Sequence, residues 1–87
     1  MNGNMHMDRA IFDLNISVEA TSLYILLCAL MDAGEIPTLE NAASKWTGTE
    51  EALTAAAREL IDRCVIEGVV PTPKEMHLHP KSRDRWC

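Results

Sequence analysis

The sequence predicts a mainly α-helical domain with one small β-hairpin. Of its 87 residues, 47% are hydrophobic but only 5% are aromatic, so aliphatic and alanine side chains must supply the core. That composition favours helices over a sandwich or barrel. Three stretches carry apolar residues at helical spacing, and an alternating stretch interrupted by prolines follows them. A chain of this length is predicted to form a single modest core.

Residues 1–16 are predicted to form an N-terminal arm. The opening "MNGNMHM" has no apolar period. The following "DRAIFDLNI" alternates loosely and places Phe12, Leu14 and Ile16 on one side, with Ile11 on the other. We therefore expect an extended arm or short strand laid on the core.

The first helix is predicted over Val18 to Asp32. Ser17 is a suitable N-cap and Gly34 a suitable stop just past the end. Its core-facing residues at helical spacing are Leu23, Leu26, Leu27, Leu30 and Met31. A second apolar strip, Tyr24, Ile25 and Cys28, predicts either cover by the protein's own arm or a surface for a dimer or another partner.

Two further helices follow a short connector in which Ile36 is expected to point inward. Thr38 can cap a helix of two or three turns that ends before Gly48, with its apolar residues at Leu39, Ala42, Ala43 and Trp46. Thr47 or Thr49 can cap the third helix. The core stripe of that third helix is Leu53, Ala56, Ala57, Leu60, Ile61 and Cys64.

The stretch after the third helix is predicted to form a strand, a proline-containing loop and a second strand. Pro71 and Pro73 follow the apolar stretch "VIEGVV", which is the first strand. In the second, Met76 and Leu78 alternate with the two histidines of "KEMHLH". The tail, residues 81–87, is basic and without a period. We expect it to be mobile apart from packing by Trp86.

The order helix, extended piece, helix, tight turn, helix and hairpin resembles a winged helix-turn-helix domain. "TLENAASKWTGTEEALTAAARELIDRCVIEG", residues 38–68, carries the resemblance. Together with "ISVEATSLYILLCALMDAG" before it, the chain is similar to the N-terminal helix-turn-helix domains of bacterial and phage replication or regulatory proteins. The resemblance implies a winged-helix domain over residues 17–80, and a transcriptional or replication regulator that binds double-stranded DNA.

In that family the third helix lies in the major groove and the wing contacts phosphate. The resemblance therefore implies two groups of DNA-binding residues. The helical group comprises Lys45, Thr49, Glu50, Glu51, Thr54, Ala55 and Arg58. The group in the wing and tail comprises Lys74, His77, His79, Lys81, Arg83 and Arg85.

The distribution of charged residues favours a partner other than DNA. The net charge is −5, and residues 1–67 hold eleven acids against four bases, whereas residues 68–87 hold two acids against four bases. Release of counterions from DNA requires Lys and Arg at the contact surface, and the third helix is itself acidic. The alternative function is an acidic winged-helix module that binds a protein rather than DNA.

The sequence favours no enzyme and no cofactor. The histidines lie near the chain ends, the internal cysteines lie on apolar stripes, and the glycines do not form a phosphate-binding loop. His77 and His79 with His6 or Cys87 are too loosely spaced to predict a metal site. Three cysteines without a CxxC pair indicate no disulfide framework, and Cys28 and Cys64 are expected to be buried fillers.

The longest apolar run, "LYILLCALM", is less than half as long as a membrane span. We therefore expect no membrane association and a cytoplasmic location.

Overall fold

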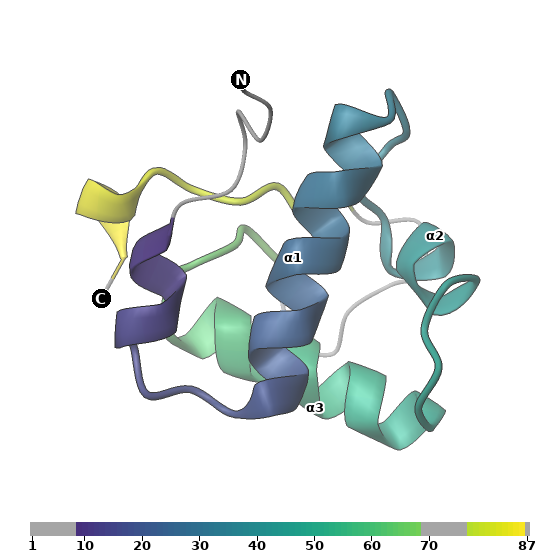
Figure 1. Ribbon diagram of the computed structural model, residues 1–87, viewed down its shortest axis with the longest axis horizontal. Coiled ribbons are helices and arrows are strands. Elements are labelled where there is room, and N and C mark those ends of the chain that lie inside the picture. The colour runs from purple at the N-terminus through teal and green to yellow at the C-terminus, as the bar shows by residue number, and fades with distance from the viewer. Residues whose placement is uncertain (1–8, 69–76, 87) are drawn as a thin grey trace.

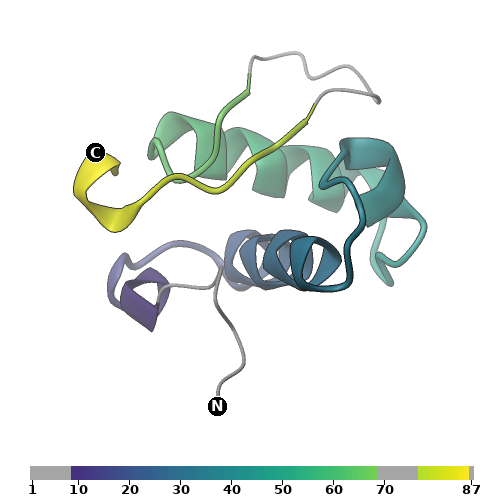
Figure 2. The ribbon, with the colours of Figure 1, turned by 90° about the horizontal axis from the view of Figure 1, so that it is seen from above.

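The computed structural model describes residues 9–68 and 77–86. Their elements are η1 (Arg9–Asp13), α1 (Val18–Asp32), α2 (Leu39–Ala43), α3 (Glu50–Asp62) and η2 (Arg83–Arg85), where η is a 3-10 helix. The domain is mainly helical, as predicted. Figure 1 shows α1 across the centre with η1 and α2 on either side of it, and Figure 2 shows α1 and α3 in two layers. Within the described ranges, no helix is long and apolar enough to cross a membrane.

α1 has the predicted bounds because both of its ends are capped. The Ser17 hydroxyl accepts a hydrogen bond from the Ala20 amide at 3.1 Å, which satisfies a donor of the first turn. At the other end Gly34 has φ +81°, and the Glu35 amide reaches back to the Leu30 carbonyl at 2.8 Å. This is the Schellman arrangement, which favours glycine at the left-handed position.

α3 begins after Thr49, whose hydroxyl accepts from the Ala52 amide at 3.1 Å, so Thr49 rather than Thr47 is the cap. Its predicted stripe is buried at Leu53, Ala56, Ala57 and Leu60. Small residues here allow α3 to pack closely on its neighbours, of which α1 is the main one.

The prediction that Cys64 is a buried filler on this stripe is wrong. Cys64 has φ +61° and lies just past α3, where the Val65 amide bonds back to the Leu60 carbonyl at 2.9 Å. The helix therefore ends at Asp62, two residues before Cys64, and the periodicity cannot continue to it. Cys64 is half-buried and disulfide-bonded.

α2 is shorter than predicted. It ends at Ala43, and Trp46 lies in the turn that follows, where its indole Nε1 donates to the Thr49 carbonyl at 3.1 Å. Ile36 is 50% exposed rather than inward. The Thr38 amide bonds to the Ile36 carbonyl at 2.9 Å, and this three-residue turn breaks the alternation on which the inward placement depended.

Short extended segments pair antiparallel beside α3. Thr38 bridges to His77 and Ile66 to Pro80. The Leu78 amide donates to the Pro37 carbonyl at 2.7 Å, and Leu78 is buried while His77 is exposed, as the alternation predicts. Within the described residues these pairings are isolated bridges rather than longer strands, and Pro71, Pro73 and Met76 lie outside that part of the chain.

The extended arm is the clearest error of the fold prediction. Residues 9–13 form η1, in which Ile11 is 1% exposed and Phe12 is 59% exposed. Ile11 and Leu14 are three residues apart and pack on the same core, with a bond from the Leu14 amide to the Ile11 carbonyl at 3.4 Å. A period of three, not two, therefore decides which side is buried.

The tail is anchored by Trp86. Its indole Nε1 donates to the Lys81 carbonyl at 3.0 Å, and its ring meets Tyr24 edge-on with centroids 5.9 Å apart. Packing by Trp86 is therefore confirmed. The turn η2 lies between Lys81 and Trp86, on the same side of the domain as η1 (Figure 1).

Replacing Ala57 with Leu tests the close packing of α3. Ala57 is 1% exposed, so the larger side chain should overpack the core and lower the free energy of unfolding by about 1–3 kcal/mol. The matched control is Ala55→Leu on the exposed side of the same helix, which should change it by about 0.5 kcal/mol or less. Urea unfolding of both variants measures the difference, and equal effects would contradict the packing described above.

Candidate nucleic-acid interface

One face of α3 is open to solvent along the helix. The helix is 13 residues and therefore about 20 Å long. Its other face packs against α1. The exposed residues of α3 are Glu50, Glu51, Thr54, Ala55, Arg58 and Asp62. The structure thus brings together, on one face, the residues of the helical group that belong to α3, with Thr49 as the cap at their start and Lys45 in the turn before it.

This face is acidic, because it carries three exposed carboxylates, those of Glu50, Glu51 and Asp62, and one positive charge, that of Arg58. The Arg58 guanidinium itself lies 4.0 Å from the Asp62 carboxylate, and both side chains are about two-thirds exposed. An exposed pair of this kind contributes little to stability, so Arg58 can exchange Asp62 for another anionic group. The Thr54 hydroxyl donates to the Glu50 carbonyl at 3.0 Å.

Glu59 does not belong to that acidic face. Its carboxylate accepts from the Ser17 amide at 2.9 Å and from the Ser17 hydroxyl at 2.7 Å. The hydrogen bonds from Ser17 lower the pKa of Glu59, with a smaller contribution from Arg63. Arg63 also donates to the Leu14 carbonyl at 3.3 Å. Helical spacing could not reveal these partners, which lie more than forty residues away in the sequence.

The predicted basic residues are not gathered into one rim. Lys45 lies in the turn before α3, whereas the Lys81 amide bonds to the Val65 carbonyl past the end of α3. Arg83 and Arg85 follow in η2, which Figure 1 shows on the side away from α2. Lys74 lies outside the described residues.

His77 and His79 are adjacent, with ring centroids 5.4 Å apart. They line a surface depression with residues of the connector between α1 and α2, including Glu35 and Ile36. Among the described residues there is no group of three or more His, Cys, Asp or Glu side chains that could hold a metal ion. His6 and Cys87 lie outside that part of the chain.

The predicted partner surface is largely internal. Tyr24 is 1% and Cys28 2% exposed, so neither can form a docking surface, and only Ile25 at 38% remains accessible. The chain's own Trp86 lies against Tyr24. Burial raises the pKa of the Cys28 thiol to about 11, an effect that a hydrogen bond with Tyr24 partly offsets.

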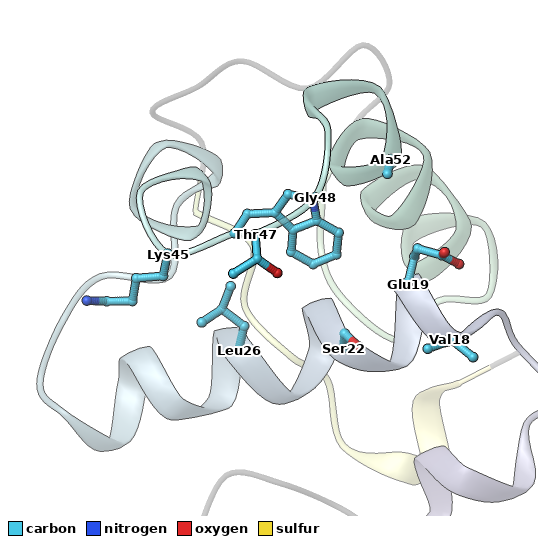
Figure 3. A pocket seen from close by; sticks show the side chains of 9 residues that line it. Val18, Glu19, Ser22, Leu26, Lys45, Thr47, Gly48 and Ala52 are labelled. Carbon is cyan, nitrogen blue, oxygen red and sulfur yellow. The ribbon is translucent and has the colours of Figure 1, made fainter.

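A groove of about 420 Å³ beside α1 was not predicted. It lies between the first half of α1, the turn that leads into α3, and Ala52 near the start of α3 (Figure 3). Its lining residues are Val18, Glu19, Ser22, Leu26, Lys45, Trp46, Thr47, Gly48 and Ala52. The missed signal was that α1 carries apolar residues on nearly every side, which leaves some of them uncovered.

Comparison with known proteins gives no relative for this chain: no protein-family model, curated protein or solved structure matches it.

The link between Glu59 and Ser17 predicts a pH dependence. Because the folded-state pKa of Glu59 lies below its ordinary value of 4.5, the link stabilises the fold fully above about pH 4.5 and is lost as the pH falls through the lower value. Glu59→Gln should cost about 1 kcal/mol at neutral pH and should flatten the acid side of the stability profile. Glu51→Gln, an exposed change on the same helix, is the control, and an equal effect of both changes would refute the link.

Thiol counting tests the state of the cysteines. The chain has three cysteines, of which Cys28 is a buried thiol and Cys64 is disulfide-bonded. A thiol reagent should react slowly with the native protein at neutral pH, because the pKa of Cys28 is raised and the side chain is inaccessible. In denaturant one thiol per chain should react before reduction and three after it. Three reactive thiols before reduction would rule out the disulfide.

Proposed function

We propose that this protein is a winged-helix domain that binds double-stranded DNA through the exposed face of α3. The observation that carries the proposal is that unobstructed face, on a helix held from behind by α1. A helix of this diameter and length fits the major groove. The antiparallel pairing of segments 65–67 and 79–81 supports a winged-helix arrangement. A role as a transcriptional or replication regulator rests on the resemblance described above.

In this proposal, Arg58 and Thr54 face the bases or the phosphates beside them. Arg58 exchanges its exposed pair with Asp62 for a guanine edge or a phosphate. Glu50 and Glu51 lie in the first turn of α3, where their negative charges interact favourably with the helix dipole. A glutamate carboxylate can also accept a hydrogen bond from cytosine. Lys45 lies in the turn before that end of the helix and contacts the backbone.

The test is a fluorescence titration with labelled random duplex DNA at low salt. A dissociation constant of roughly 1–100 µM that weakens with added salt is expected for binding of this type. Arg58→Ala should weaken binding about tenfold, and Glu51→Lys should strengthen it. Glu35→Lys makes the same charge change on an exposed residue away from α3 and should have a smaller effect. No binding up to about 100 µM, or equal effects of the two lysine variants, would exclude this surface.

A second candidate function is the binding of a basic protein segment, and one observation favours it. Glu40 and Glu50 line a depression of about 140 Å³ between α2 and α3, together with the apolar side chains of Leu39, Ala43 and Leu53. A lysine or arginine can place its aliphatic stem on such an apolar floor and its charge against the carboxylates.

The two functions predict opposite effects of one substitution. Glu50→Lys should strengthen binding to duplex DNA but weaken binding to a labelled peptide that alternates lysine with leucine. A peptide that alternates glutamate with leucine is the matched probe, and it should bind the native protein more weakly. Equal affinity for both peptides would remove the second candidate.

A further inference from the structure

The exposed face of α1 carries no charge between its two ends. The helix has only two ionisable carboxylates, Glu19 in its first turn and Asp32 at its last residue. Between them the exposed residues are Ser22, Ile25 and Ala29, and Val18 at the start of the helix is 78% exposed. These four residues follow one another at helical spacing and form a continuous strip. Solvent-facing helices ordinarily carry charged side chains along such a strip.

The groove beside this strip has opposite charges at its two ends. Figure 3 shows Val18 and Glu19 at one end, Leu26 and Lys45 at the other, and Ser22 between them. Leu26 is partly buried against the core, and Trp46 adds an aromatic side chain to the lining. A partner that matches this groove must be apolar in its middle, basic beside Glu19 and acidic beside Lys45.

We propose that the occupant is a second copy of this chain, bound across a two-fold axis that passes near Ser22. Such an axis makes the two α1 helices antiparallel, so each end of the groove meets the opposite end of its partner. Glu19 then faces Lys45 of the second copy, and this pairing occurs twice. The same surface therefore supplies both halves of the charge complementarity.

The apolar residues of the groove obey the same symmetry. Val18 and Leu26 lie four residues on either side of Ser22, so the antiparallel arrangement places Val18 of each copy over Leu26 of the other. The small side chain of Ser22 lets the helices approach closely at the crossing. Burial of Val18 and Ile25 supplies the apolar contribution, because both are accessible in the single chain.

Sedimentation velocity over a range of protein concentrations, without DNA, tests the proposal. The protein should associate reversibly to a dimer. Glu19→Lys and Lys45→Glu should each weaken the dimer roughly tenfold or more, because each places like charges together twice. The doubly substituted chain, with Glu19→Lys and Lys45→Glu together, should regain most of the lost affinity, since the opposite charges then meet again.

Two controls separate this effect from a change in folding or in net charge. Ile25→Asp should abolish association without unfolding the chain, because Ile25 is partly exposed, and circular dichroism checks the fold. Glu51→Lys makes the same charge change on α3 and should leave the dimer unchanged. A monomer at all concentrations, or a double variant that is no better than either single one, would overturn the proposal. Both results are independent of whether DNA is bound.

Discussion

The burial of α1 is the constraint on which the rest of the structure depends. This helix is apolar on almost every side, and a single packing partner cannot cover it. α3 and α2 pack against it, Ile11 of η1 joins the same core, and Trp86 returns from the tail to meet Tyr24. Residues near both ends of the described chain therefore pack on the core of a small domain, where each buried side chain is a large share of the total.

Helices were predictable because their signals are local. Ser17 and Gly34 mark the ends of α1, and the alanine and leucine stripe of α3 identifies its buried face. The arm was wrongly predicted because alternation over a few residues does not separate an extended chain from a 3-10 turn. The covering of α1 by Trp86 and the link between Glu59 and Ser17 join residues far apart in sequence, so no local pattern could reveal them.

The same distinction applies to the surface. Helical spacing correctly placed Glu50, Thr54 and Arg58 on one exposed face, whereas it could not show that Lys45 and the tail arginines lie at different ends of α3. Likewise, the strip of Tyr24 and Cys28 was visible in the sequence, and cover by the protein's own chain was one of its two interpretations, but the contact of Tyr24 with Trp86 was not predicted. The groove beside Val18 depends on how the turn before α3 lies over α1, which is a property of the packing alone.

The hydroxyl of Ser17 takes part in two bonds at once, as acceptor from the Ala20 amide and as donor to Glu59. The start of α1 is thus capped by an atom that α3 holds in position. The first turn of α1 and the last turns of α3 are consequently coupled, because fraying of either helix end removes a hydrogen bond that supports the other.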